Sequence, residues 1–254
     1  MRRLFPALSR PVRHSPLALA VFSALAFGPG CADVSSNLGG EVTYAKDAQG
    51  NYDLGEKSFK SHSWADADQY FQFTKSKFPY SRFAALAELR VADANFEQDK
   101  FVEAIDGYKN FIKDHPSHPK VDYAACQIAK SHFKDLPSNF FLFPPVYEKD
   151  QQELVDAQGA IKDFLLSYPR SEYRPEGQKM MAEVRKRLAQ HEMYVAAFYE
   201  KRGYKKAAAW RYENVVKEFG DTPQAEEAGR QARELYAKLP PDTRHYGQPL
   251  PASN

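Results

Sequence analysis

The sequence contains few of the residues and motifs that enzymes, disulfide-rich proteins and nucleic-acid-binding proteins depend on. Its 254 residues include two cysteines, too few for a disulfide framework, and 13 glycines. Little glycine and few β-branched runs argue against an all-β fold, and a formal net charge of +2 gives no reason to expect nucleic-acid binding. Motifs for nucleotide-binding glycine loops, zinc-protease helices and serine-hydrolase elbows are also missing from the sequence. At 43% apolar residues the chain still has enough hydrophobic material for a core, which excludes generic disorder.

The 17 prolines are unevenly distributed, and the gaps between them predict helices. Proline is tolerated at the start or end of a helix but breaks its interior. Long proline-free intervals therefore indicate helices or helix pairs, with the prolines at the breaks between them. The proline-free intervals are 30–78, 80–115, 120–136, 146–168, 176–222 and 224–239.

Residues 1–30 have the layout of a secretory signal. Four arginines and no acid precede an apolar run of eleven residues, Leu17–Phe27, which is too short to span a bilayer permanently. The run ends at Gly28-Pro29-Gly30-Cys31, which resembles the lipobox of bacterial lipoproteins, although Gly28 replaces the usual leucine three residues before the cysteine. We therefore expect lipid (palmitate) attachment at Cys31. The alternative is an ordinary signal peptide that is cleaved elsewhere and leaves Cys31 unmodified.

The residues that follow this signal point to a tethered, mildly acidic protein. Removal of residues 1–30 would take away four cations and no acid, which changes the formal net charge from +2 to −2. Ala32, rather than an aspartate, follows the cysteine, and by resemblance to enteric lipoproteins this favours the outer membrane. Residues 31–50 are polar and contain Gly39-Gly40, so we expect a flexible tether.

Four segments of the chain repeat one helical pattern, closing at Pro79, Pro116, Pro169 and Gly220. Counted back from each closing residue, an alanine stands twelve residues earlier, and larger or branched residues stand eight and five residues earlier. This spacing places all three positions on one face of a helix, where the small residue allows a neighbouring helix to approach closely. The alanines are Ala67, Ala104, Ala157 and Ala208, and the other positions are Phe71, Thr74, Tyr108, Phe111, Ile161, Phe164, Tyr212 and Val215.

Another helix precedes this one in each repeat. In the first repeat it is marked by Leu54, Gly55 and Ser58, which lie 25, 24 and 21 residues before the closing proline, and the same offsets recur in the second and fourth repeats. The combined spacing resembles that of the tetratricopeptide repeat. The sequence therefore predicts an all-α fold, a right-handed solenoid of about four to five tetratricopeptide-like helical hairpins over residues 51–239. The alternative is an unrelated helical bundle with a periodic core.

The repeats are unevenly spaced, and each excess predicts an additional feature. The first two closing residues are 37 residues apart, but the next two intervals are 53 and 51 residues. The first excess indicates an inserted loop at about 136–148, whose apolar run Phe140–Phe143 would either form an interaction patch or fold back onto its own repeat. The second indicates one long helix at about 175–203, with a proline at its start and a glycine at its end. A last helix would cap the array, and residues 240–254 would form a disordered tail.

No constellation of side chains in the sequence marks a catalytic or metal site, so we expect no enzymatic activity, no cofactor and no metal. His115 and His118 are three residues apart but flank prolines in a predicted turn, with no third ligand at a suitable spacing. Cys126 and His132 are six residues apart on one predicted helix and therefore point to different faces. We expect Cys126 to be a small buried core residue.

Several local stretches resemble the BamD family, the lipoproteins of the bacterial outer-membrane β-barrel assembly machinery. His118-Pro119-Lys120-Val121-Asp122-Tyr123-Ala124 resembles the segment that opens the third repeat of that family, and the apolar insertion follows at the family's place. The stretch 187–203 resembles its long fourth-repeat helix, and residues 208–222 continue in register. The resemblance covers about residues 44–238; it departs at Gly220, where the family usually has proline, and in the lipobox.

The resemblance implies a non-enzymatic scaffold that is anchored by its lipid on the periplasmic face of the outer membrane. It implies that the C-terminal repeats bind the last POTRA domain of BamA, beside other lipoproteins of the machinery, and that the N-terminal repeats engage the signal strand of unfolded outer-membrane proteins. It also implies that Arg211, and Arg202 at the preceding turn, contact BamA, since arginine offers a planar fork of donors. Each arginine could instead be solvated or pair within its repeat. The alternative function is that of another tetratricopeptide-repeat envelope lipoprotein, scaffolding cell-division or peptidoglycan factors.

Overall fold

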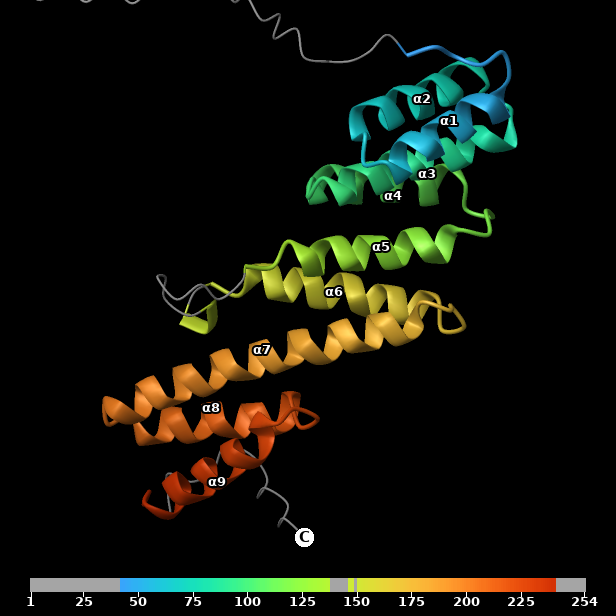
Figure 1. The fold of residues 1–254 in the computed structure, drawn as a ribbon. Helices are drawn as coiled ribbons and strands as arrows, with labels where there is room; N and C mark the ends of the chain where they lie inside the picture. The colour runs from blue at the N-terminus through green and yellow to red at the C-terminus, as the bar shows by residue number, and fades with distance from the viewer. Residues whose placement is uncertain (1–41, 138–145, 149, 241–254) are drawn as a thin grey trace, which may run out of the picture. The chain divides into compact units, whose positions relative to one another are not determined.

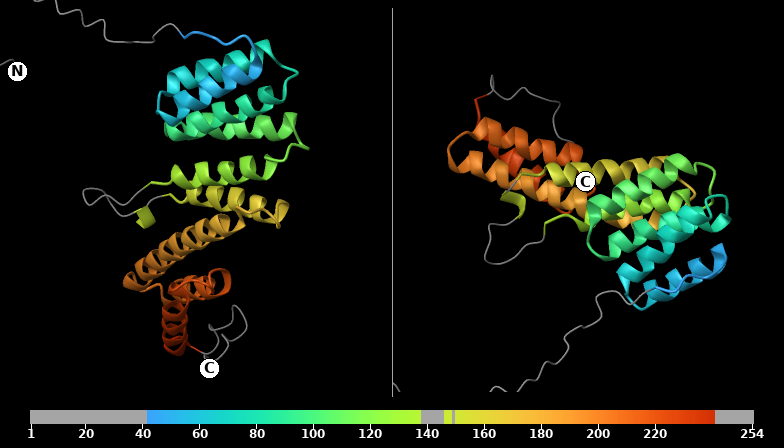
Figure 2. Two further views of the ribbon diagram at one scale, coloured as in Figure 1. Left: turned by 45° about the vertical axis from the view of Figure 1, so that its right-hand side comes forward. Right: turned by 90° about the horizontal axis from the view of Figure 1, so that it is seen from above.

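The computed structural model describes residues 42–137, 146–148 and 150–240, and these residues form nine α-helices and one short 3-10 helix without a strand (Figure 1). The helices are α1 (Ala48–Lys60), α2 (Trp64–Lys77), α3 (Arg82–Glu97), α4 (Phe101–Asp114), α5 (Val121–Lys134), η1 (Val146–Glu148), α6 (Gln152–Ser167), α7 (Arg174–Lys201), α8 (Lys205–Glu218) and α9 (Gln224–Ala237). Each α-helix packs against the next along the chain, as the two further views show (Figure 2). The predicted all-α array of helical hairpins is confirmed: the hairpins are α1–α2, α3–α4, α5–α6 and α7–α8, followed by α9.

The repeated positions of the sequence form the centres of these hairpins. All twelve residues predicted to face a neighbouring helix are buried, and none is more than 4% exposed. They lie on the second helix of each hairpin, so the 12, 8 and 5 offsets mark the same packing contact in all four repeats. Cys126 in α5 is also buried, as expected, and burial raises the pKa of its thiol to about 12.

Small residues set how closely the helices of a hairpin approach. Gly55 in α1 lies against the ring of Phe71 in α2, and a Cβ atom added there would meet Phe71 Cε1 at 2.5 Å. Gly107 in α4 faces Ala92 in α3, where an added Cβ would meet the alanine Cβ at 2.8 Å. A methyl group at either glycine would force the two helices apart.

The turn inside three of the hairpins depends on one residue with a left-handed backbone. His62, Asp99 and Gly203 have φ values of 60°, 58° and 82° and stand between the two helices of their hairpins. All three lie 17 residues before the closing residue of their repeat, an offset that the sequence pattern did not reveal. Only glycine adopts this conformation without a steric cost, so the first two turns carry a cost that the last one avoids.

Helix α7 links two hydrophobic cores. It spans 28 residues, with a proline in its first turn and Gly203 just after its C-cap, and it lies where the sequence predicts a long helix, at about 175–203. Its Met180, Val184 and Leu188 pack with α5 and α6 in one core, and its Ala189 and Ala196 pack with α8 and α9 in the next. A shorter helix could not supply both faces, which explains the long interval between the last two repeats.

The N-terminal boundary and the insertion differ in detail from the expectation. The first helix begins at Ala48, before the expected start at 51, and the amide of Asn51 fixes residues 45–47 by bonding the carbonyls of Ala45 and Asp47 at 2.9 and 2.7 Å. Residues 45–50, which fall within the segment expected to form a tether, are therefore part of the first hairpin.

The described end of the insertion folds back onto α7. The His191 Nδ1 atom of α7 lies 2.7 Å from the Tyr147 carbonyl oxygen, and the rings of Tyr147 and Tyr194 are 5.5 Å apart. Cys31, the Phe140–Phe143 run and residues 241–254 lie outside the described residues.

Candidate functional site

The two arginines singled out in the sequence both lie on the last hairpin. Arg202 is the C-cap of α7, is exposed, and holds its guanidinium carbon 4.5 Å from the centre of the Phe198 ring. Gly203 then turns the chain with its positive φ, and the Tyr204 amide bonds the Tyr199 carbonyl at 3.0 Å. The turn therefore displays Arg202 and Tyr204 next to each other at the end of the hairpin.

Arg211 lies one helix further on and pairs within its repeat, which is one of the alternatives that the sequence left open. Its Nη1 atom lies 3.2 and 3.1 Å from the two carboxylate oxygens of Glu192 in α7. Its guanidinium carbon also lies 5.3 Å from the centre of the Trp210 ring. The Arg211 side chain remains 32% exposed, so a partner can still reach it.

Exposed aromatic side chains surround the arginines, and the sequence reading did not single them out. Phe198, Tyr204 and Trp210 are 43%, 61% and 48% exposed. Aromatic residues and arginine are the types that dominate binding energy in protein interfaces. We call Phe198, Arg202, Tyr204, Trp210 and Arg211 the hairpin surface.

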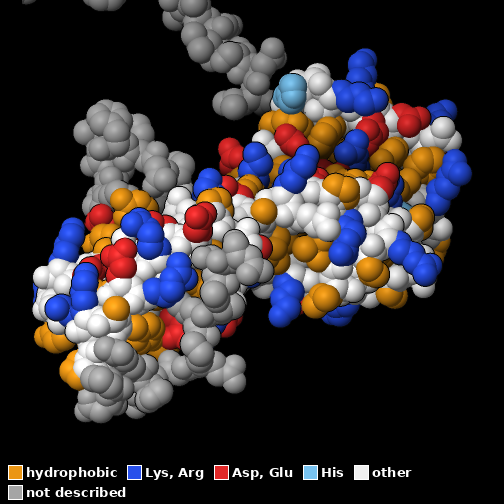
Figure 3. All heavy atoms as spheres, turned by 90° about the horizontal axis from the view of Figure 1, so that it is seen from below, with side chains coloured by type: hydrophobic (Ala, Val, Ile, Leu, Met, Phe, Trp, Pro, Cys, Tyr) orange, Lys and Arg blue, Asp and Glu red, His pale blue; other side chains and the backbone are white. Residues whose placement is uncertain are grey.

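Positive charge is concentrated in the part of the sequence that forms the turn and the first half of α8. Residues 201–211 contain five lysines and arginines and no acid, a signal that was present in the sequence. In the space-filling view, Lys and Arg side chains lie among hydrophobic and acidic ones on the face that is shown (Figure 3). Such a surface attracts a partner that carries carboxylates.

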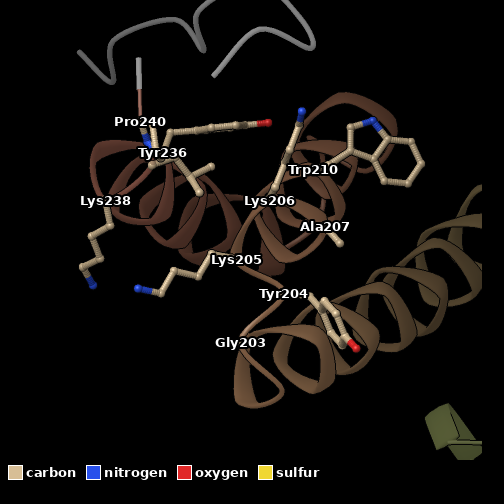
Figure 4. A pocket seen from close by; sticks show the side chains of 10 residues that line it. Gly203, Tyr204, Lys205, Lys206, Ala207, Trp210, Tyr236, Lys238 and Pro240 are labelled. Atoms are coloured by element: carbon tan, nitrogen blue, oxygen red, sulfur yellow. The ribbon is translucent and has the colours of Figure 1, made fainter. Parts of the chain in front are cut away.

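A groove of about 900 Å³ adjoins the hairpin surface (Figure 4). It is lined by residues of the α7–α8 turn, of α8 and of the end of α9. Tyr204, Trp210 and Tyr236 supply aromatic rings, and the lysines are Lys205, Lys206 and Lys238.

Hydrogen bonds between tyrosines and two glutamates hold α7, α8 and α9 together. Glu213 in α8, 2% exposed, accepts a hydrogen bond from the Tyr236 hydroxyl at 2.7 Å and pairs with Lys217 at 2.9 Å. The Tyr212 hydroxyl donates to Glu200 in α7 at 3.3 Å. Burial, followed by the charge of Glu200, raises the pKa of Tyr212 to about 12, so this donor stays protonated at neutral pH. These bonds therefore fix the arrangement of the helices that carry the hairpin surface.

A second polar cluster joins the N-terminal hairpins. Asp93 in α3, 4% exposed, accepts hydrogen bonds from the hydroxyls of Tyr108 and Tyr123 at 2.7 and 3.0 Å and pairs with Arg90 at 3.0 Å. Arg90 also pairs with Glu56 of α1. A pocket of about 400 Å³ lies beside this cluster, lined by residues of α1, α3 and α5.

The histidines in the turn between α4 and α5 have local partners. The His115 ring lies 5.2 Å from the Phe111 ring, and its Nε2 atom lies 3.3 Å from a Glu88 carboxylate oxygen. His118 also packs on Phe111, with ring centres 5.2 Å apart. Within the described ranges, no three acidic, histidine or cysteine side chains come together as a metal site would require.

A family model described as "Outer membrane lipoprotein" (YfiO) matches residues 44–246, which include every helix described above. The chain belongs to this family. Among the curated relatives of this chain, the outer membrane protein assembly factor BamD of Neisseria gonorrhoeae is 25% identical over 225 residues, covering 88% of this chain and 84% of that protein. BamD of Neisseria meningitidis serogroup A is 27% identical over 74% of this chain and 71% of that protein. BamD of Caulobacter vibrioides is 26% identical over 74% of this chain, but only 59% of the longer relative is matched.

The fold of this family member was also compared with solved structures, and its helices with the length and hydropathy of membrane spans. A tetratricopeptide-repeat protein of Thermus thermophilus matches with a TM-score of 0.36 at 15% identity, over 76% of this chain and 89% of that one. The fold assignment therefore rests on the helices themselves. Among the helices in the described part of the chain, none has the length and apolar character needed to cross a bilayer.

Proposed function

We propose that the protein is a lipid-anchored, non-enzymatic scaffold of the outer-membrane β-barrel assembly machinery. The observation that carries this proposal is the family match over 44–246, together with relatives named as outer membrane protein assembly factors. An array of helical hairpins suits a scaffold because each hairpin adds surface for a partner without requiring a catalytic cleft. Cys31 carries the lipid and holds the chain on the periplasmic face of the outer membrane.

The hairpin surface binds the POTRA region of BamA in this proposal, with Arg202 and Arg211 as the charged contacts. Both guanidiniums stand beside exposed aromatic rings, so a partner carboxylate would meet a charge-assisted donor next to apolar area. The bonds of Tyr236 to Glu213 and of Tyr212 to Glu200 hold α9 and α7 on α8, so the helices that carry the two arginines are positioned before binding, which reduces the entropy lost in the complex.

The N-terminal hairpins engage the signal strands of unfolded outer-membrane proteins, and further lipoproteins of the machinery bind elsewhere on the array. The pocket beside Asp93 supports the first role because it exposes tyrosine, leucine and charged side chains from three hairpins to one segment. Main-chain groups of an extended strand would find hydrogen-bond donors and acceptors there.

Depletion of the protein in cells tests this function. Levels of folded β-barrels in the outer membrane are expected to fall, and affinity purification of the full chain from solubilised membranes is expected to recover BamA. Unchanged barrel levels together with purified material that lacks BamA would contradict the proposal. Recovery of cell-division or peptidoglycan factors in its place would indicate the alternative envelope scaffold.

A further inference from the structure

The groove beside the hairpin surface ends where the described chain ends. Pro240, the last described residue, is itself part of the groove wall, and the sequence continues for 14 residues beyond it. Figure 4 shows Pro240 next to Tyr236, with Lys206 and Trp210 further along. The chain that follows Pro240 therefore begins at the groove itself.

The sequence of this segment matches the chemistry of the groove. It contains Gln248-Pro249-Leu250-Pro251, and proline-rich segments bind grooves lined by aromatic rings because their backbone is already restricted before binding. The groove presents Tyr204, Trp210 and Tyr236. Asp242, two residues beyond Pro240, lies close to the three lysines of the groove in sequence terms, but Arg244 balances its charge, so the proline–aromatic match carries the argument.

We propose that residues 241–254 dock in this groove of their own chain, with Pro249, Leu250 and Pro251 against the rings of Trp210 and Tyr204. Pro249 is nine positions beyond Pro240 in the sequence, a stretch that spans up to about 30 Å when extended. Helix α8, which carries Trp210, is about 21 Å long at 14 residues, so the segment reaches every part of the groove.

Self-docking needs little intrinsic affinity. A short tether holds its end at an effective concentration on the order of a millimolar, so a dissociation constant below that value suffices for occupancy. Because Trp210 belongs to both the groove and the hairpin surface, the docked segment covers part of the surface assigned to BamA. The segment then acts as an internal competitor that a partner must displace, a consequence that rests on the proposed function, whereas the docking itself does not.

Fluorescence of Trp210 tests the docking directly. Trp64→Phe leaves Trp210 as the one tryptophan of the full chain, since the sequence contains two. In this background we compare acrylamide quenching of the native segment, of P249S/L250S/P251S, and of the control A252S/S253A/N254S. Docking predicts that the quenching constant rises about twofold in the proline–leucine variant, as shielding of an aromatic contact is lost, and stays unchanged in the control. Equal quenching in all three chains would overturn the proposal.

Two further measurements identify the occupant. A peptide of residues 241–254 added to the proline–leucine variant is expected to restore protection of Trp210 saturably, and a scrambled peptide is not. Protection in the native chain is expected to survive about hundredfold dilution, as a tethered ligand requires. Loss of protection on dilution would show that a second copy supplies the segment and would overturn self-docking. Neither result depends on capture of BamA, so failure here is distinct from failure of the proposed function.

Discussion

Arg211 in α8 and Glu192 in α7 form an ion pair at the edge of the hairpin surface, with Nη1 3.1 and 3.2 Å from the two carboxylate oxygens. The side chains are 32% and 17% exposed, so water screens the pair and its contribution to stability is at most about 1 kcal/mol. Within the described residues the pair engages one guanidinium nitrogen, so the group's other nitrogens are left for the partner contact of the proposed function. Substitution of Arg211 should therefore change the free energy of unfolding little, so an effect on partner binding can be measured separately.

Alanine substitution at two glycines should have opposite effects on stability. Gly55→Ala would place a Cβ atom 2.5 Å from Phe71 and is expected to lower the free energy of unfolding by about 1–3 kcal/mol. Gly159→Ala in α6 meets nothing within 4 Å and is expected to raise it by about 0.5–1 kcal/mol, because alanine favours a helix over glycine. Urea unfolding measures both, and an equal effect of the two substitutions would refute the close helix contact.

The left-handed turns predict a second pair of opposite changes. His62→Gly should raise the free energy of unfolding by about 0.5–1 kcal/mol, since glycine removes the steric cost at φ 60°. Gly203→Ala should lower it by about 1–2 kcal/mol, because alanine then carries that cost. Asp99→Gly serves as the repeat of the first measurement. If His62→Gly and Asp99→Gly both lowered the free energy of unfolding, the native side chains would be shown to stabilise these turns.

The buried Asp93 cluster should be sensitive to the loss of a single hydroxyl. Tyr108→Phe leaves the Asp93 carboxylate without a 2.7 Å donor in a site 4% exposed, so we expect a loss of about 1–3 kcal/mol in the free energy of unfolding. Tyr80→Phe removes a hydroxyl from a fully exposed ring and is the matched control, with a change near zero. Equal results for the two variants would mean that the bond to Asp93 does not stabilise the fold.

Acid should remove the stabilisation provided by Asp221. Arg185 in α7 donates to both oxygens of Asp221 at 3.0 and 2.9 Å, and this bonding lowers the pKa of the carboxyl in the folded state. A lowered pKa means that the stabilisation is present above the unfolded pKa of about 3.9 and disappears as pH falls through the folded value.

The half-exposed Asp221 limits the size of this effect. The difference in unfolding free energy between the native chain and Asp221→Asn is expected to stay below about 1 kcal/mol at pH 7 and to vanish in strong acid. Glu103→Gln, at an exposed acid of α4, is the control at both pH values. A difference that persists below pH 2 would assign the effect to packing instead of charge.

The hairpins and the long helix could be predicted from the sequence because their causes are local and periodic. Ala67, Phe71 and their equivalents recur at fixed offsets, because a buried helix face requires apolar residues or, as at Thr74, a polar group bonded to its own helix. The length of α7 could be predicted from the long interval between the last two closing residues, since the additional residues contain no proline that would end a helix.

The details of the site could not be predicted in the same way. The left-handed turns at His62 and Asp99 could not be predicted because the residue type at this position differs between repeats, although its distance in sequence from the closing residue is constant. The pairing of Arg211 with Glu192 joins residues 19 positions apart on separate helices, so it depends on how α8 packs on α7. The exposure of Trp210 likewise depends on what α9 leaves uncovered.

Affinity of the full chain for the POTRA region of BamA, measured by titration calorimetry, tests the proposed function most directly. The design compares the native chain, Arg211→Glu, the charge swap Arg211→Glu with Glu192→Arg, and the control Arg230→Glu at an exposed α9 residue. The swap restores the internal ion pair and its stability, but it leaves an acid where the partner needs a cation. We predict affinity about 30-fold weaker for Arg211→Glu, equal weakness for the swap, and native affinity for the control. Native affinity for Arg211→Glu, or full recovery in the swap, would contradict a direct contact.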